Sequence, residues 1–296
     1  MIIAVTGATG FVGTALLNHA LAAGHQVRAL ARRAQAPQDG VTWIAGDLAS
    51  PRDLMQGADA LIHVAGVVNA PDRAGFAAGN TDGTRTILAA ATLAGVARFV
   101  HTSSLAAREP DLSLYGWSKA QAEALVQDAP LAWTIVRPPA IYGPGDLDQL
   151  DLYRLAARGL ALLPPRGRLS LLAVDDLARL LLALATGDAP RTIHEADDGT
   201  EGWTHEAYAR AIGAAVGRRV LPIHLPRLAL SLAARADRAW RGDKARLTAD
   251  RVTYFCHPDW TIDPARRPAP SLWEPRIDTT VGLAETARWY RAHGLL

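Results

Sequence analysis

The sequence is poor in cysteine and in lysine, and each shortage narrows what the chain can be. Cys256 is the only cysteine among 296 residues, which excludes an intrachain disulfide and a zinc site built on thiolates. The nine histidines are dispersed without metal-ligand spacing, so we expect no metal. Only two of the 31 basic residues are lysines, Lys119 and Lys244. A lysine is therefore an uncommon choice in this chain.

Long apolar runs and a dominant sign of charge are also missing. The most apolar late stretch, Leu177 to Ala185, is too short to span a bilayer and contains Arg179. No cleavable apolar segment precedes the first expected strand, so we expect a soluble protein of the cytoplasm. The net charge is +2, and the arginines are scattered along the chain. This distribution argues against a dedicated nucleic-acid face.

The first thirteen residues, MIIAVTGATGFVG, contain an apolar run and then a glycine turn that opens a helix. Met1 to Val5 fits a buried parallel strand, and Gly7, Gly10 and Gly13 follow with the spacing G-x-x-G-x-x-G. Gly7 suits a sharp turn, Gly10 allows an anion to approach the main chain, and Gly13 allows close packing of helix on strand. A pyrophosphate would meet free N–H groups at the helix N-terminus. This order favours a dinucleotide ligand over an unliganded turn.

The end of the second expected strand bears on which dinucleotide binds. His25 to Ala31 fits this strand, and an NAD-binding unit would carry an acidic residue near its end, about 20 residues past the glycines. Ala31 stands there instead, followed by Arg32 and Arg33. Guanidinium groups match a 2′-phosphate with forked donors, whereas a carboxylate would repel it. We therefore expect NADP(H) rather than NAD(H), the alternative being that both arginines are solvated loop charges.

Strand and helix patterns alternate through the first half of the chain. Further strands are expected at residues 41–45, 60–64, 97–102 and 131–137. This alternation predicts an α/β fold, a doubly wound parallel sheet (Rossmann) over residues 1–145, to which residues 170–200 return. We expect residues 146–296 to form a smaller C-terminal α/β region that mainly binds substrate.

Ligands bind beyond the carboxyl ends of parallel strands, which selects further candidate cofactor contacts. Asp47 is placed to accept a hydrogen bond from an adenine amino group, although a capping role is an open alternative. The small pair Ala65 and Gly66 can lie under the cofactor. The candidate contacts in this part of the chain are Gly7, Thr9, Gly10, Phe11, Val12, Gly13, Arg32, Arg33, Asp47, Leu48, Ala65, Gly66, Asn80 and Ser103.

The segment Tyr115-Gly116-Trp117-Ser118-Lys119 opens a helix that is expected to continue through Ala129. A spacing of four puts Tyr115 and Lys119 on one helix face. A nearby ammonium group lowers the pKa of a phenol toward the range of a proton donor and acceptor. The chance that some lysine of this chain follows a tyrosine by four is about 4%. A merely solvated pair would leave unexplained why the position is not arginine.

Together, TGATGFVG, the strand-end serines of HTSS, YGWSK and RPPAIYGPGD resemble the extended short-chain dehydrogenase/reductases, which include the NAD-dependent epimerase/dehydratases. The resemblance implies that Tyr115 is the general acid that protonates a carbonyl oxygen. It implies that Lys119 holds the nicotinamide ribose and lowers the pKa of Tyr115. Ser104, in preference to Ser103, would donate a hydrogen bond to the substrate oxygen.

The resemblance also concerns the segment after the sixth strand and the assembly. It implies that Pro138 and Ile141 contact the cofactor. It further implies a homodimer formed by the helices near Asn80 to Ala94 and Tyr115 to Ala129, although both helices could pack only on their own sheet.

The substrate is less specified by the sequence. Many nucleotide-sugar enzymes of this family carry R-x-x-N-x-x-G, and Ala140 replaces the asparagine here. The leucines from Leu147 to Leu163 suit a lipophilic pocket or an ordinary core. We expect an NADP(H)-dependent oxidoreductase that interconverts a ketone or aldehyde and the alcohol on a mainly apolar small molecule. The alternatives are a nucleotide-sugar epimerase/dehydratase with tightly bound NAD, and a non-catalytic cofactor-binding assembly or sensor protein.

The segment Pro222 to Trp240 alternates leucines with arginines, as an amphipathic helix does. We expect this helix to pack on the smaller domain rather than on a membrane, because an acid-poor basic cluster is missing.

Overall fold

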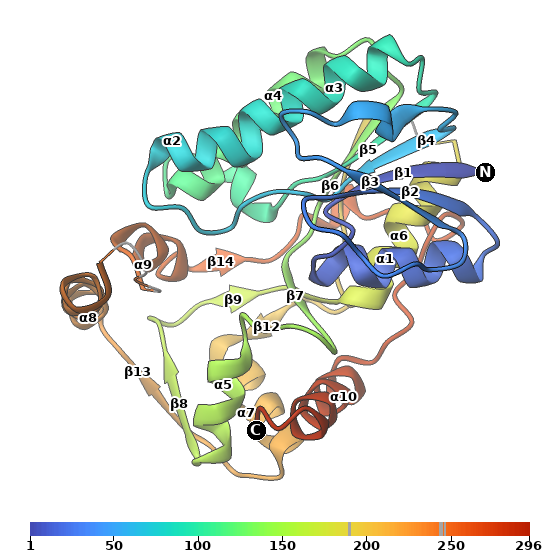
Figure 1. The fold of residues 1–296 in the computed structure, drawn as a ribbon. Coiled ribbons are helices and arrows are strands. Elements are labelled where there is room, and N and C mark those ends of the chain that lie inside the picture. Colours follow the sequence, from blue (N-terminus) through green and yellow to red (C-terminus); the bar gives the residue numbers. More distant parts are fainter. Residues whose placement is uncertain (189–190, 243–244, 246) are drawn as a thin grey trace. The chain divides into compact units, whose positions relative to one another are not determined.

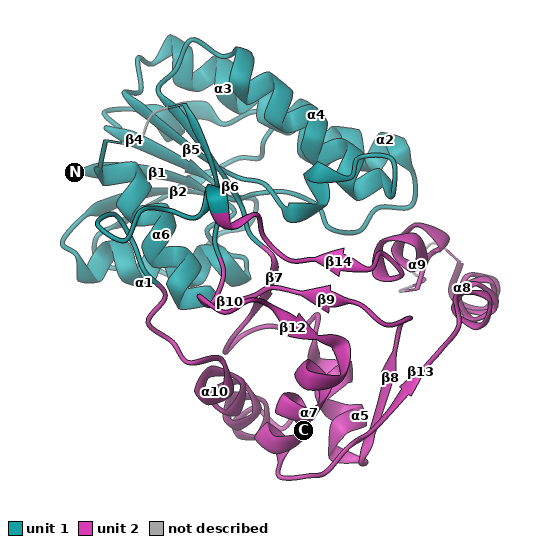
Figure 2. Cartoon of the chain, turned by 180° about the vertical axis from the view of Figure 1, so that it is seen from behind, with its two compact units in different colours: residues 1–138, 174–196, 265–274 teal, residues 139–173, 197–264, 275–296 magenta. Residues whose placement is uncertain are grey.

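The computed structural model describes residues 1–188, 191–242, 245 and 247–296. The chain forms two compact units (Figure 2). Unit 1 comprises Met1–Pro138, Val174–Ala196 and Ala265–Glu274, and unit 2 comprises Pro139–Ala173, Asp197–Pro264 and Pro275–Leu296. The assignment of residues 146–296 to substrate binding stays a prediction, because compactness does not reveal a ligand.

Unit 1 is built on a seven-stranded sheet in the order β11-β6-β5-β4-β1-β2-β3, and every neighbouring pair is parallel. Its strands are β1 (Ile2–Thr6), β2 (Gln26–Ala31), β3 (Val41–Ala45), β4 (Ala60–His63), β5 (Arg98–Thr102), β6 (Trp133–Arg137) and β11 (Thr192–Glu195). Chain order reverses between β1 and β4, so their carboxyl ends form the switch point at which such sheets bind ligands. The predicted doubly wound parallel sheet is confirmed.

Helices cover both faces of this sheet. Its main helices are α1 (Phe11–Ala22), α3 (Gly83–Leu93), α4 (Leu114–Asp128) and α6 (Val174–Thr186). Figure 1 shows α3 and α4 on one face and α1 and α6 on the other. The core between the sheet and the first pair is formed by side chains that are 0% exposed, among them Ala4, Leu61, Ile87, Phe99, Val126 and Ile135. Burial on both faces explains why the strands read as apolar runs.

The helix expected from Asn80 begins earlier in the structure. The short helix α2 (Arg73–Phe76) leads into the π-helical stretch η2 (Ala77–Asp82), which leads directly into α3. Two 3₁₀ helices complete this part of the chain, η1 (Arg52–Met55) and η3 (Leu105–Arg108). A wider π turn re-aims side chains, and Asn80 lies in it.

Unit 2 combines short strands with five helices among its described residues. The strands are β7 (Ala140–Tyr142), β8 (Leu160–Leu163), β9 (Arg168–Leu169), β10 (Leu171–Ala173), β12 (Trp203–Thr204), β13 (Leu221–His224) and β14 (Asp259–Trp260). The helices are α5 (Leu150–Ala157), α7 (His205–Val216), α8 (Arg227–Arg241), α9 (Ala249–Phe255) and α10 (Thr279–Ala292), and the 3₁₀ turn η5 (Pro264–Arg266) follows β14. Buried Tyr142, Tyr153 and Tyr290 form the centre of its core. The leucine-rich stretch 147–163 is thus divided between a helix and a strand.

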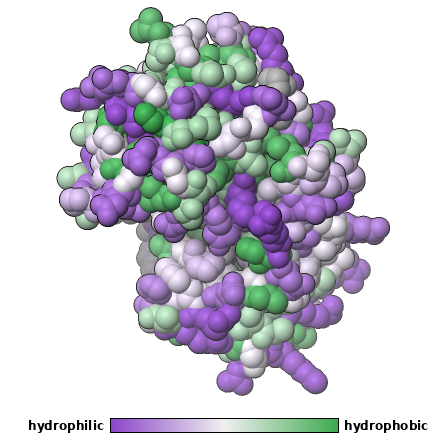
Figure 3. Space-filling model, turned by 90° about the vertical axis from the view of Figure 1, so that its right-hand side faces the viewer, coloured by the Kyte–Doolittle hydropathy of each residue, from purple (hydrophilic) through white to green (hydrophobic). Residues whose placement is uncertain are grey.

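The amphipathic segment differs from the prediction at its start. Leu221–His224 is a strand that pairs in parallel with β8, and the helix begins only at Arg227. Pro226 precedes the first turn, where its missing N–H costs nothing. No helix in the described part of the chain is long and apolar enough to cross a bilayer. On the face shown in Figure 3, hydrophobic and hydrophilic side chains are interspersed.

Candidate active site

The glycine turn after β1 leaves no room for side chains. Gly7 has φ +73°, and a Cβ there would lie 2.7 Å from the amide nitrogen of Ala65. A Cβ on Gly13 would lie 2.0 Å from the carbonyl oxygen of Gly7. Gly10 donates its N–H to that same oxygen at 3.0 Å. Gly7 and Gly13 are therefore required by the close contact of strand, turn and helix, whereas a Cβ on Gly10 would meet only the Gly7 carbonyl oxygen, at 3.3 Å.

The N-terminus of α1 has backbone N–H groups that no described side chain caps. Gly10 is the N-cap residue and supplies no side chain, and no hydrogen bond from a described side chain caps the helix. The first-turn N–H groups at Phe11 and Val12 thus have no partner within the helix. The turn has space that a Cβ would otherwise fill, and the helix N-terminus has backbone N–H groups without a side-chain cap. Both features fit the pyrophosphate of a dinucleotide. Thr9 is exposed beside this turn.

A buried histidine, His63, joins the elements around the switch point through its two ring nitrogens. The Nδ1 atom of His63 lies 2.6 Å from Thr6 Oγ1, and its Nε2 atom lies 3.0 Å from Thr84 Oγ1. Thr6 Oγ1 also accepts a hydrogen bond from the amide of Ala65 at 3.2 Å. Burial, with a smaller contribution from the charge of Lys119, lowers the pKa of His63 to about 3. A neutral imidazole therefore joins β1, β4 and α3. The sequence analysis missed it, although a histidine in the apolar strand ALIHV was a signal.

Asn80 holds the loop that follows β4. Its Oδ1 atom accepts from the amide of Val67 at 2.8 Å, and its Nδ2 atom donates to the carbonyl of Val67 at 2.9 Å. The same amide group donates to Ser118 Oγ at 2.8 Å. A Cβ on Gly66 would lie 2.8 Å from Asn80 Oδ1, so a small residue is required there. The structure gives Asn80 a positioning role, and its contact with a cofactor stays a prediction.

Lys119 is buried at the carboxyl end of β5. Its side chain is one of the few buried charges of unit 1 and donates from Nζ to the carbonyl oxygen of Thr102 at 2.8 Å. A Cβ on Gly66 would lie 3.5 Å from Nζ, which places the ammonium group beside the loop after β4. Burial lowers the pKa of Lys119 to about 8, and the charge of Glu123 opposes this shift. The lysine is therefore not a solvated surface residue.

Tyr115 lies one turn before Lys119, where α4 begins. Ser113 caps this helix by accepting from the amide of Gly116 at 2.9 Å. A Cβ on Gly116 would lie 2.6 Å from the carbonyl oxygen of Ala106, so the start of α4 packs closely on η3. Ser104 is the N-cap residue of η3. Gly116, which the sequence analysis did not single out, thus brings the helix of Tyr115 against the turn of Ser104.

The two strand-end serines have different partners. Ser103 Oγ donates to Glu123 Oε1 at 2.5 Å, which uses its proton. Ser104 Oγ accepts from the amide of Ala106 at 3.2 Å, and an oxygen that accepts still has a proton to donate. The role of Ser104 as the donor to a substrate stays a prediction.

A buried ion network lies behind these residues. Arg137 donates to both carboxylate oxygens of Glu123, at 2.9 and 2.6 Å, and to Glu195 at 3.4 Å. Arg108 donates to the other oxygen of Glu195 at 3.2 Å. Glu195 is 0% exposed, so each carboxylate charge is compensated by an arginine. The network ties α4, β6, β11 and η3 together and was missed because its members are far apart in sequence.

The candidates for the adenosine end lie at the ends of β2 and β3. Arg32 and Arg33 are exposed, and neither forms an ion pair with a carboxylate of the described residues. Asp47 Oδ1 accepts from the amides of Ala49 and Ser50, each at 3.0 Å, so it caps the turn before η1. Leu48 packs against Gly83, where an added Cβ would lie 2.7 Å from the Cδ1 atom of Leu48.

The last two candidates belong to different units. Pro138 ends the first segment of unit 1, and its carbonyl oxygen accepts from the amide of Leu105 at 3.1 Å. Ile141 lies in β7 of unit 2, opposite Leu172 of β10. Their contact with a cofactor stays a prediction.

Comparison with known proteins supplies the remaining findings. The family model described as NAD(P)H-binding matches residues 7–185. A ceramide reductase of Caulobacter vibrioides is 36% identical over 307 residues, which cover 100% of this chain and 96% of the relative. A 2-alkyl-3-oxoalkanoate reductase of Stenotrophomonas maltophilia is 31% identical, over 90% of this chain and 93% of the relative. The solved structure of MoeE5 in complex with UDP-glucuronic acid and NAD has a TM-score of 0.76 at 22% identity and covers 99% of both chains.

Proposed function

This chain belongs to the extended short-chain dehydrogenase/reductases and is an NAD(P)-dependent oxidoreductase, and from this premise we propose that it uses NADP(H) to interconvert a ketone and the alcohol on an apolar, lipid-like molecule. One observation carries the proposal. The ammonium group of Lys119 is buried at the carboxyl end of β5, one helical turn from Tyr115 and beside the loop that follows the switch-point strand β4.

The proposed roles follow from this arrangement. Bound nicotinamide supplies a hydride to the carbonyl carbon. Tyr115 then gives its phenolic proton to the carbonyl oxygen, and Ser104 donates a hydrogen bond to the same oxygen. The positive charge of Lys119 favours the phenolate that remains and holds a ribose hydroxyl. In the oxidation direction the phenolate of Tyr115 accepts the proton of the alcohol.

The names of the relatives support a long-chain substrate. One relative is named a ceramide reductase and another a 2-alkyl-3-oxoalkanoate reductase, and the first aligns over the whole of this chain. Ceramide carries a secondary hydroxyl group on its long-chain base, and the oxidised form of that group is a ketone. We therefore propose a lipid of the ceramide class as substrate, with this ketone as the hydride acceptor.

Two alternatives make different predictions. A nucleotide-sugar epimerase would retain NAD through purification and bind a uridine diphosphate sugar. MoeE5 supports only the fold at its level of identity, and Ala140 stands where many such enzymes carry asparagine. A non-catalytic sensor or assembly protein would not need both Tyr115 and Lys119, which this chain retains.

Replacing Arg32 with Ala is expected to weaken NADPH binding about tenfold to a hundredfold, because one charged hydrogen bond to the 2′-phosphate is lost. NADH binding should change little, since NADH lacks that phosphate. Nicotinamide fluorescence measures both dissociation constants. Arg288→Ala, on an exposed face of α10, is the matched control. Equal weakening of both cofactors, or tighter NADH than NADPH binding by the wild type, would contradict the choice of NADP(H).

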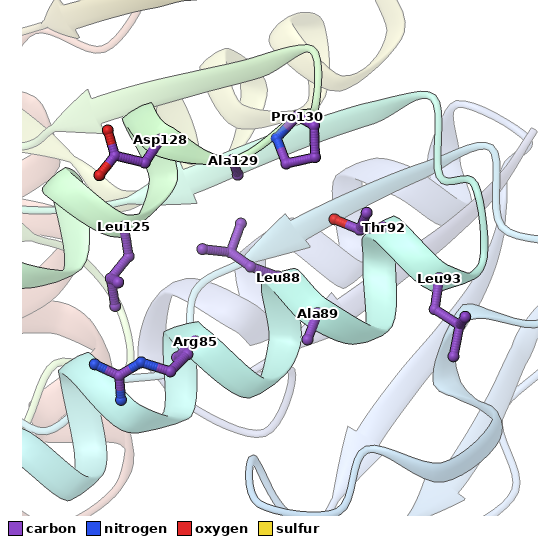
Figure 4. Close-up of a pocket in the computed structure, with 9 residues that line it drawn as sticks. All are labelled: Arg85, Leu88, Ala89, Thr92, Leu93, Leu125, Asp128, Ala129 and Pro130. Atoms are coloured by element: carbon purple, nitrogen blue, oxygen red, sulfur yellow. The ribbon is translucent and has the colours of Figure 1, made fainter.

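We also propose that the enzyme is a homodimer through α3 and α4. A surface groove lies between these helices, and Leu88 of α3 and Leu125 of α4 point toward one another in it (Figure 4). Its lining residues are Arg85, Leu88, Ala89, Thr92, Leu93, Leu125, Asp128, Ala129 and Pro130. Leu93 is 92% exposed, and contact with the same helices of a second copy would bury it.

Leu93→Asp is therefore expected to convert a particle of two 31.5 kDa chains into one of 31.5 kDa, because the dimer would bury an unpaired carboxylate. Light scattering after size exclusion measures the mass. Val281→Asp, at an exposed position of α10, should leave it unchanged. A wild type that already has the mass of one chain would refute the dimer.

A further inference from the structure

Helix α8 turns its apolar side chains outward. Ala234 is its only buried residue. Leu228 is 73% exposed, Leu232 56% and Trp240 83%. Large apolar side chains are seldom exposed together in this way. The helix lies in the smaller unit, as predicted, and is in contact with α9, but Ala234 lies on the side of the helix opposite to the exposed Leu228 and Leu232.

Helical spacing explains the geometry of this surface. Leu228, Leu232, Ala236 and Ala239 follow one another at intervals of four, four and three, which places them in one stripe. All four are exposed, and Trp240 flanks the stripe. The neighbour of α8 is α9, which is in contact with it in unit 2. We call the stripe with Trp240 the outer face of α8.

The two strands before α8 expose a second apolar face. In the parallel pair β8 and β13, Leu160 is opposite Leu221 and Leu162 is opposite Ile223. Alternation along a strand puts these four side chains on one side of the pair, and all four are exposed. Only Leu225 and Pro226 separate β13 from α8. The two exposed apolar faces are therefore close in sequence, and both belong to unit 2.

The charges of α8 indicate what this surface meets. The helix carries four arginines and one acidic residue, Asp237. Asp237 is paired with Arg241 at 3.3 Å and also accepts from the amide of Leu247 at 2.9 Å. Arg235 and Arg238 are exposed beside the outer face. The one carboxylate of the helix is therefore already engaged by Arg241.

From this surface we infer that α8, together with the exposed faces of β8 and β13, docks on an anionic phospholipid bilayer. Leu228, Leu232 and Trp240 enter the headgroup region, while Arg235 and Arg238 contact lipid phosphates. Arginine stems can lie along the apolar stripe with their guanidinium groups in the polar layer. A second copy of this chain fits less well, because two such helices would bring arginines of like charge together. The inference depends on this surface and not on the proposed reaction.

Flotation with vesicles tests the inference on the whole protein. The wild type should bind vesicles of equimolar phosphatidylcholine and phosphatidylglycerol, bind phosphatidylcholine alone weakly, and be released by salt. Leu232→Asp is expected to weaken binding at least about tenfold, because a charge replaces an inserted leucine. Val281→Asp is the matched control, since Val281 is 53% exposed and Leu232 56%. The double variant Arg235→Glu, Arg238→Glu should lose the preference for phosphatidylglycerol.

Each result of the vesicle experiment either supports or overturns the inference. A wild type that does not float with anionic vesicles overturns the inference, and so does equal loss in Leu232→Asp and Val281→Asp. If Leu232→Asp instead halves the particle mass in the absence of vesicles, the outer face is an interface between copies and the lipid assignment is refuted. Turnover of a detergent-dispersed ketone by Leu232→Asp should equal that of the wild type. Failure of the proposed reaction would leave the vesicle result standing, so the two failures are distinguishable.

Discussion

Tyr115→Phe is expected to lower kcat about a thousandfold, because the variant lacks the proton that the carbonyl oxygen must receive. The aromatic ring stays, so its tilted contact with Phe76, at 6.3 Å between ring centroids, should be kept. The buried ammonium group of Lys119 is bound to the main chain of β5 and does not depend on the phenol for its position. NADPH should therefore still bind, and the loss should be confined to the chemical step.

Two measurements together check this expectation. Steady-state oxidation of NADPH with a ketone substrate gives kcat, and fluorescence titration gives the dissociation constant of NADPH. Ser104→Ala is a graded comparison, because a hydrogen bond to the substrate oxygen is lost while the proton donor remains, and its kcat should fall less. If Tyr115→Phe turns over like the wild type, Tyr115 is not the general acid.

Gly13→Ala is expected to weaken NADPH binding about a hundredfold and to lower the free energy of unfolding by about 3 kcal/mol. The added Cβ would lie 2.0 Å from the Gly7 carbonyl oxygen and 2.7 Å from Ala8 Cα. Both obstacles are backbone atoms, so α1 must move away from the turn. That movement takes the first-turn amides away from the phosphates that they would bind.

A glycine at the other end of the same helix provides the control. Gly24 follows α1 with φ +77°, and a Cβ there would meet nothing within 4 Å. Gly24→Ala should cost about 1 kcal/mol of stability through its backbone conformation and leave the NADPH dissociation constant unchanged. Denaturant unfolding and fluorescence titration measure the two quantities. Tight NADPH binding by Gly13→Ala would show that the glycine turn does not hold the cofactor.

The features that the sequence predicted are those with a local cause. An apolar strand followed by glycines at fixed intervals requires only residues 1–13, and the outcome is β1, the turn and α1. The parallel sheet follows from repeated alternation of strand and helix patterns. The shared helix face of Tyr115 and Lys119 follows from a spacing of four. Each of these inferences needs only neighbours in sequence.

The features that were missed join distant residues. Arg137 meets Glu195 because β6 pairs with β11, and it meets Glu123 because α4 packs on β6, and no local pattern reveals either contact. In the sequence, His63 is only a polar residue in an apolar strand. Its partners Thr6 and Thr84, which contact its two ring nitrogens, become apparent only in the structure. Long-range hydrogen bonds of this kind decide which buried polar residues are tolerated.

For helix α8, the sequence did not reveal which face is buried. Its sequence specifies an apolar and a basic side, and both are present in the structure. Which side the protein covers depends on the elements that pack against it, and here these leave Leu228, Leu232 and Trp240 outside. Periodicity predicts that a helix has two faces, but it does not predict which face is buried.

The most direct test of the proposed function is the oxidation of NADPH by the purified protein with the ketone form of a ceramide, followed by its absorbance. We predict turnover that depends on the ketone, that is faster with NADPH than with NADH, and that is lost in Tyr115→Phe. Protein that consumes no NADPH with this substrate, and that instead carries bound NAD and epimerises a uridine diphosphate sugar, would contradict the proposal.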